Sequence, residues 1–227
     1  MKIRTLIAGN IALLLLATVS VRAAGPVTIY NARSGSKMRI EGTANIIHPT
    51  WQIESPLIGG MMEIGPGFPT EPGQAVTPGK VEAKADAFIQ VRSLKSVKKD
   101  GTHYDDRMDE VTYEHLKEAR FKQIFFHLSE LTLKEAPKTK DAPYVFDAKG
   151  DLTVAGVTNK IAMVVNVLPL ADKRLEITGR TAVKMTDFKV EPVDINLVLG
   201  HIKTGDEVKL VFKWLLGPKK TPAAAAK

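Results

Sequence analysis

The sequence contains no cysteine. Disulfide frameworks, thiol catalysis and thiolate metal sites are therefore excluded, and the fold must be stabilised by packing. Common catalytic signatures are missing as well: there is no G-x-S-x-G nucleophile elbow, no phosphate-binding P-loop and no glycine-rich dinucleotide turn. No two of the five histidines have the spacing of a zinc motif such as H-E-x-x-H. We therefore expect a protein that is not an enzyme, without catalytic, metal-binding or cofactor-binding residues.

Long apolar runs are absent except near the N-terminus. Residues 1–23 combine a basic start, MKIR, with an apolar run that ends at Val21, and Val21 and Ala23 fit the small-residue pattern of a cleavage site. We predict a signal peptide over 1–23, cleavage before Ala24 and a periplasmic location. The run is too short to span a bilayer comfortably, so an uncleaved membrane anchor is the weaker alternative.

The folded part of the chain also lacks an excess of one charge. The formal net charge is +7, but six of the cations lie in the predicted signal peptide or near the C-terminus: Lys2, Arg4, Arg22, Lys219, Lys220 and Lys227. The remaining body is close to neutral. A basic stripe for nucleic acid is therefore not expected, and no nucleic-acid partner is predicted.

Alternation of apolar and polar residues dominates what is present. Residues 80–91 (KVEAKADAFIQV) place Ala83, Ala85 and Ala87 on one face and mostly charged residues on the other. The same pattern recurs at 144–154, 174–185 and 206–214, and more weakly at 36–44, 51–55, 59–64, 123–131, 160–168 and 194–199. Loops are predicted at 65–79, which is rich in Gly and Pro, and at 134–143. Many alternating strands separated by turns are typical of an antiparallel barrel or sandwich.

One segment, 105–121, has helical periodicity. Asp106 is placed to cap this helix, and acidic residues favour its first turn. The apolar stripe expected to pack on the barrel consists of Met108, Val111, Leu116 and Ala119.

The inward rows of the predicted strands are rich in small residues. The interior of a barrel of about eight strands is just wide enough to be filled by side chains or to hold one ligand. Small inward residues therefore favour a cavity, and close packing against the helix or a facing strand is the alternative. The residues expected to line an apolar tunnel are Ala83, Ala85, Ala87, Phe146, Ala148, Ile177 and Val183.

Read in order, four parts of the sequence resemble the YceI-like family of exported polyisoprenoid-binding proteins. They are SKMRIEGTANIIHPTWQIES (36–55), DDRMDEVTYEHLKEARFKQIFFHLSEL (105–131), GDLTVAGVTNKIAMVV (150–165), and VKMTDFKVEPV (183–193) with GHIKTGDEVKLVFKW (200–214). The second and third are the most specific. Their order and spacing cover most of the sequence after the predicted signal peptide.

The resemblance implies an all-β fold with one short helix, an extended antiparallel lipocalin-like β-barrel of about eight strands around an apolar tunnel. It implies non-catalytic binding of an isoprenoid or other long-chain lipid, of the polyprenyl phosphate or isoprenoid quinone type. The polar head would stay near the mouth of the tunnel, where polar loops can contact it. The barrel domain would span 24–216, followed by a disordered tail at 217–227. Transient contact with a membrane or a delivery protein stays open, as does the oligomeric state.

The segment GTANIIHPTW (42–51) resembles a corner that follows the first long strand in this family. On that interpretation, His48 and Trp51 shape a strand turn and perform no chemistry. Two other functions stay open beside lipid carriage. One is a protein-interaction module with a filled barrel, using loops 65–79 and 92–106. The other is an unrecognised hydrolase using His48 or His127.

Overall fold

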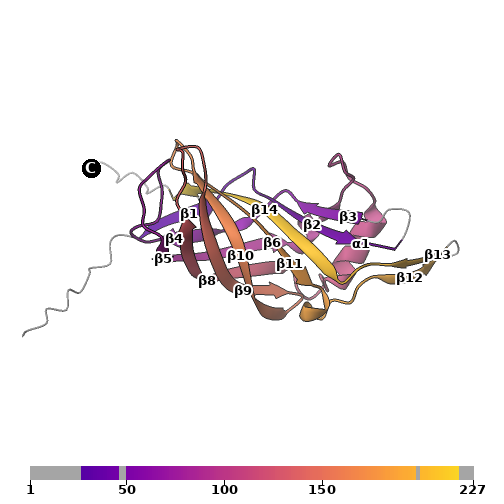
Figure 1. Ribbon diagram of the computed structural model, residues 1–227. Helices are drawn as coiled ribbons and strands as arrows, with labels where there is room; N and C mark the ends of the chain where they lie inside the picture. The colour runs from indigo at the N-terminus through magenta and orange to yellow at the C-terminus, as the bar shows by residue number, and fades with distance from the viewer. Residues whose placement is uncertain (1–26, 46–49, 198–199, 220–227) are drawn as a thin grey trace, which may run out of the picture.

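Eight antiparallel strands close into a barrel in the computed structural model, which describes residues 27–45, 50–197 and 200–219 (Figure 1). In order around the barrel they are β1 (Thr28–Ala32), β4 (Gly59–Ile64), β6 (Ala83–Gln90), β8 (Gln123–Glu135), β9 (Tyr144–Val154), β10 (Val157–Pro169), β11 (Leu175–Lys184) and β14 (Glu207–Pro218). Pairing of β1 with β14 closes the ring. The predicted all-β barrel of about eight strands with one short helix is confirmed. The predicted signal peptide and His48 lie outside the described residues.

Further strands extend this barrel wall. β2 (Lys37–Thr43) follows β1 along the same edge of β14, and β3 (Thr50–Ser55) pairs with β2 and with the short β7 (Lys95–Ser96). β5 (Gly79–Val81) pairs with β8. The ribbon of β12 (Asp194–Leu197) and β13 (Gly200–Lys203) projects away from the barrel (Figure 1). Two short 3-10 turns, η1 (Val91–Ser93) and η2 (Thr186–Phe188), complete the elements.

The C-terminal strand is longer than expected. We predicted a disordered tail from residue 217, but β14 continues through Pro218, and the Lys219 amide donates to the Ile29 carbonyl over 2.8 Å. This extension is the part of β14 that pairs with β1. The closure of the barrel therefore depends on residues that composition alone assigns to the tail.

One end of the barrel is filled with aromatic side chains. β9 turns Tyr144 and Phe146 inward, and both are fully buried. The predicted loop 65–79 packs here: Phe68 stacks on Phe146 with ring centroids 5.7 Å apart, and the Tyr144 hydroxyl donates to the Gln74 carbonyl over 2.6 Å. This loop is therefore part of the core at this end of the barrel.

The one α-helix among the described residues, α1 (Asp106–His115), begins one residue from its predicted cap. Asp105 is the cap residue, and its carboxylate accepts a hydrogen bond of 3.0 Å from the Met108 amide. Asp105 has the extended backbone that a cap requires, whereas Asp106 is already helical, so the prediction of Asp106 was wrong. Within the described residues, no helix is long and apolar enough to cross a membrane.

The buried face of α1 also differs from the predicted apolar stripe. The helix buries Asp109 and Tyr113, while Met108, Val111 and Leu116 are only half-buried. Ala119 is exposed and lies beyond the end of the helix. The reason is the surface on which α1 packs: it meets β7 and the turn before it, which present backbone amides and carbonyls that require polar partners.

Asp109 joins the helix to the barrel wall. One carboxylate oxygen accepts a 2.6 Å hydrogen bond from the Ser96 amide, and the other lies 3.0 Å from Lys95 Nζ and 2.9 Å from His103 Nε2. Burial by itself would raise the pKa of Asp109, but these hydrogen bonds outweigh it and hold the pKa below its ordinary value of 3.8. The same contact raises the pKa of Lys95 to about 12.

Acidification is expected to weaken this contact. A carboxylate with a lowered pKa stabilises the fold above its unfolded-state pKa, and this contribution is lost as the pH falls through its folded-state pKa. At neutral pH, Asp109→Asn should therefore lower the free energy of unfolding by about 1.5–3 kcal/mol, and the difference from wild type should shrink below about pH 4. Denaturant unfolding of both proteins across this range measures it. A difference that is independent of pH would contradict the assignment.

Trp51, in the segment interpreted as a corner after the first long strand, has a structural contact. Trp51 lies directly opposite Gly42 in the β2–β3 register, and its indole nitrogen donates to the Thr43 carbonyl over 3.1 Å. This bond links the two strands at the end of the hairpin. This contact agrees with the structural interpretation of Trp51.

Candidate functional site

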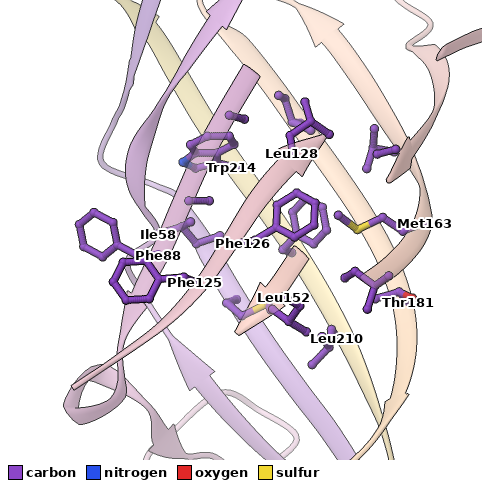
Figure 2. A pocket seen from close by; sticks show the side chains of 18 of the residues that line it. Ile58, Phe88, Phe125, Phe126, Leu128, Leu152, Met163, Thr181, Leu210 and Trp214 are labelled. Atoms are coloured by element: carbon purple, nitrogen blue, oxygen red, sulfur yellow. The ribbon is translucent and has the colours of Figure 1, made fainter. Parts of the chain in front are cut away.

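An apolar cavity of about 120 Å³ lies within the barrel (Figure 2). Its lining comes mainly from the inward rows of β6, β8, β9, β10, β11 and β14. No charged side chain is among the lining residues, and Thr181 supplies the only hydroxyl. The cavity therefore suits an uncharged, hydrocarbon-rich group.

The residues predicted to line a tunnel divide into two groups. Ala85, Ala87, Ala148 and Ile177 lie on the cavity, where β6, β9 and β11 face one another. The other three lie elsewhere along the same inward rows: Ala83, Phe146 and Val183. Alternation thus placed the correct face inward, but it could not tell how far along each strand the open space extends.

The positions of those three residues follow from strand register. Ala83 pairs with Ile64, which is 2% exposed, and Phe146 is covered by Phe68 at the filled end of the barrel. Val183 pairs with Val208, two residues along β11 from Thr181. Each therefore contacts packed side chains beyond the cavity.

Large side chains occupy much of the interior that the small residues were expected to leave open. Gly150 faces the ring of Phe126, and Gly179 faces the ring of Phe212: a methyl group added at either glycine would come within 2.7 Å of that ring. Both rings line the cavity. The small inward residues are thus partly matched by aromatic neighbours on adjacent strands, which explains why the cavity is small.

Several lining residues were not predicted. Phe126 lies in the run IFF, where three consecutive apolar residues hide which of them face inward. Met38, Met62 and Met163 also line the cavity. Methionine is flexible and adapts to irregular spaces, so these three side chains are suited to move when the cavity is occupied. These methionines were not predicted, because their positions in the sequence follow no pattern that marks a cavity.

Trp214 contributes a polar atom to this apolar wall. The residue is 5% exposed, and its indole lies among the lining side chains (Figure 2). Its Nε1 atom has no hydrogen-bond partner among the described residues. A buried donor without a partner costs about 1–3 kcal/mol, so a ligand atom that accepts this hydrogen bond would recover part of that cost.

The lining reaches the surface beside an aromatic pair. Phe88 and Phe125 are directly opposite each other on β6 and β8, with ring centroids 6.2 Å apart (Figure 2). Phe125 is 46% exposed, although it is among the residues that line the cavity. Alternation places both rings on the outer face of the wall, next to the inward Ala87 and Phe126.

A cluster of His103, Asp106 and Asp109 has the residue types of a metal site, with ligand atoms within 4.8 Å of one another. The Asp109 oxygens are already engaged by the Ser96 amide, by His103 and by the Lys95 ammonium. A cation here would have to compete with the positive charge of Lys95. The cluster therefore fits the anchoring of α1 better than metal binding.

His127 was one of the two residues considered for a hydrolase. Its Nδ1 atom lies 2.7 Å from an Asp86 carboxylate oxygen on the outer surface of the barrel, and both side chains are exposed. Among the described residues, no serine hydroxyl is hydrogen-bonded to this imidazole. The pair is typical of a surface contact between neighbouring strands.

Comparison with known proteins agrees with this fold. The YceI-like domain matches residues 67–215. A polyisoprenoid-binding domain from Saccharophagus degradans, implicated in plant cell wall breakdown, superposes with a TM-score of 0.58 at 13% identity, over 86% of this chain and 100% of that one. BcnA from Burkholderia cenocepacia superposes with a TM-score of 0.53 at 15% identity, over 79% and 96%.

At these identities the structural matches speak for the fold alone. A search of curated protein sequences found no match. The family assignment therefore rests on the domain match, which covers well over half of the chain and all the barrel strands from β6 onward except the last residues of β14. The chain belongs to the YceI-like domain family.

Proposed function

We propose that the protein binds and carries an isoprenoid or similar long-chain amphiphile in its barrel cavity, without converting it chemically. The observation that carries this proposal is the cavity wall, which has no charged side chain. A hydrocarbon chain moved from water to such a wall gains about 25 cal/mol for each Å² of apolar surface removed from water. The polyisoprenoid-binding domain of similar fold supports the same ligand class.

Uptake of a long chain requires the cavity to widen. Sites for drug-sized ligands usually measure about 300–1,000 Å³, and a dry cavity of about 150 Å³ holds a ring the size of benzene. The cavity of about 120 Å³ is therefore too small for an isoprenoid chain in its present form. We propose that the methionines and the Phe126 and Phe212 rings move aside, and that the chain enters beside Phe88 and Phe125.

Mass spectrometry of an organic extract from natively expressed, purified protein tests the proposal. We expect an isoprenoid or similar long-chain lipid to be recovered in proportion to the protein. Absence of any bound lipid, together with no uptake of a fluorescent long-chain lipid, would rule out the carrier function. The small volume of the cavity would then favour the second candidate, a protein-interaction module with a filled barrel.

The unpartnered indole of Trp214 supports a more specific ligand class, a chain that carries a neutral hydrogen-bond acceptor such as a carbonyl oxygen. Trp214→Phe keeps an aromatic ring and removes the N–H donor. We expect the affinity for a carbonyl-bearing isoprenoid to fall about threefold to tenfold, the size of one hydrogen bond, with no loss of stability. Displacement of a fluorescent lipid measures the affinity of the wild type and of the variant. An isoprenoid hydrocarbon without oxygen is the control, and an equal loss of affinity for it would show that only shape matters.

We further propose that the protein acts in the periplasm after removal of residues 1–23. The basic start and the apolar run of that segment support export. The intact mass of protein from a periplasmic extract should correspond to a chain that begins at Ala24. A mass that retains Met1 would contradict cleavage and favour an uncleaved anchor.

A further inference from the structure

A second concave surface lies on the outside of the barrel. It is a groove of about 670 Å³ over β2, β10, β11 and β14, the outer face of strands whose inner face lines the cavity. Four cationic side chains line it: Lys37, Arg39, Arg180 and Lys213. No carboxylate is among its lining residues. We call this surface the basic groove.

The strand register brings like charges together in the basic groove. Lys37 on β2 lies directly opposite Lys213 on β14, and Val211 on β14 lies opposite Arg39 on one side and Arg180 on the other. Like charges directly opposite each other on neighbouring strands destabilise a sheet. The fold thus keeps a repulsive arrangement that its own stability does not require.

Acidic neighbours offset only half of these charges. Glu54 lies 2.6 Å from Lys37 Nζ and 2.5 Å from Arg39 Nη2, and Glu41 lies 3.7 Å from Arg39. Arg180 and Lys213 form no ion pair with another described residue. The basic groove therefore keeps a net positive charge.

The outer face of β8 and β9 has a different arrangement. There Lys149 lies 2.8 Å from Glu130, and Lys134 lies 3.4 Å from Asp147. These lysines are individually paired with carboxylates on a neighbouring strand. The uncompensated charge is thus a local feature of the basic groove, and the outer face of β8 and β9 supplies lysines for a matched control.

The shape of the charge distribution indicates the kind of partner. The cations are spread over three adjacent strands, which lie about 4.8 Å apart, and do not converge on one point as a site for a single phosphate would. Val211 lies between Arg39 and Arg180, and Val164, which is 45% exposed, lies beside Arg180 on β10, so both contribute aliphatic surface next to the cations. Cations that flank exposed aliphatic groups are suited to a lipid interface, where charged heads and acyl chains meet.

We propose that the basic groove docks the protein onto the anionic phospholipid head groups of a membrane surface. The attraction is electrostatic, with a small aliphatic contribution, and leaves the barrel folded and outside the acyl core. This docking does not depend on the ligand proposed for the cavity, because the residues of the basic groove lie on the outer face of the barrel wall. A docked barrel would nevertheless lie next to a source of lipid.

Co-sedimentation of the full chain with vesicles tests the proposal. We compare vesicles of phosphatidylcholine alone with vesicles of equal parts phosphatidylcholine and phosphatidylglycerol. The protein should bind only the anionic vesicles and be released between about 0.1 M and about 1 M salt. The double variant Arg180→Gln, Lys213→Gln should bind about 25-fold more weakly, roughly fivefold for each cation removed near the surface.

The control variant Lys134→Gln, Lys149→Gln removes the same charge from the paired face and should bind as wild type does. No binding of wild type to anionic vesicles, or an equal loss in both double variants, would overturn the proposal. So would displacement by inorganic phosphate at matched ionic strength, which indicates a single-anion site. Preference for a polyglutamate peptide over vesicles would assign the groove to an acidic protein partner instead.

Vesicle binding and lipid uptake, measured on the same variants, distinguish the docking proposal from the carrier function. Ala148→Phe alters the cavity and none of the cations in the basic groove, so it should keep wild-type vesicle binding. Failure of the carrier function would appear as absent lipid uptake with intact docking. Failure of the docking proposal would appear as absent vesicle binding with intact uptake from detergent.

Discussion

Replacing Tyr113 with alanine is expected to lower the free energy of unfolding by about 3–5 kcal/mol, the range measured for large buried aromatic residues. Tyr113 is 4% exposed and is the main apolar contact between α1 and the barrel. Its hydroxyl donates to the carbonyls of Leu94 and Arg92, at 2.9 and 3.2 Å, and the Arg92 guanidinium lies 4.9 Å above its ring. Denaturant unfolding measures the change.

Two matched variants identify the source of this effect. Tyr113→Phe keeps the ring and removes the hydroxyl, so it should cost only about 1 kcal/mol. Tyr104→Ala removes a tyrosine that is 48% exposed and should change stability by less than about 0.5 kcal/mol. If Tyr113→Ala behaves like Tyr104→Ala, the helix is not docked as described.

Ala148→Phe is expected to have the largest effect on ligand uptake. Ala148 is 2% exposed and lines the cavity from β9, so an added ring enters the space proposed for the isoprenoid chain. Ala85→Phe, from β6 on the same cavity, should act in the same way. We expect binding of a fluorescent long-chain lipid to be lost in both variants, and overpacking of the small cavity to cost about 1–3 kcal/mol.

Stability and binding together decide between the carrier and the filled barrel. Ala162→Phe is the control, because Ala162 is on the outer face of β10 and exposed, so it should affect neither property. Loss of uptake with only a modest loss of stability supports a cavity that opens for its ligand. Lost stability, together with no lipid binding by the wild type, would show that the barrel is a filled core and would reject the carrier.

The inward faces of the strands could be predicted from alternation alone. The pattern at 144–154 placed Phe146, Ala148 and Leu152 on one face, and all three are buried. A period of two is a property of the extended backbone, so it does not depend on which strands are neighbours. The all-β class and the inward position of Ala85 and Ile177 follow from this local rule, whereas the choice of a barrel over a sandwich came from the family resemblance.

Contacts between distant segments could not be predicted in this way. Phe68 covers Phe146 from a loop that has no periodicity, and the rings of Phe126 and Phe212 lie against Gly150 and Gly179 on adjacent strands. Alternation shows which face a residue occupies, but not its partner across the sheet, because the partner depends on register. The extent and volume of the cavity therefore follow from register.

The polar contacts of the helix show the same limit. An apolar stripe was a reasonable criterion for the buried face of the helix. Asp109 and Tyr113 are buried instead, because Asp109 accepts a hydrogen bond from the Ser96 amide and Tyr113 donates one to the Leu94 carbonyl. The basic groove likewise arises because β2, β14 and β11 are neighbours, although β2 is far from the other two in sequence. Side-chain periodicity is determined by the local backbone, whereas partners for buried polar groups and for clustered charges are determined only when the folded chain brings distant strands together.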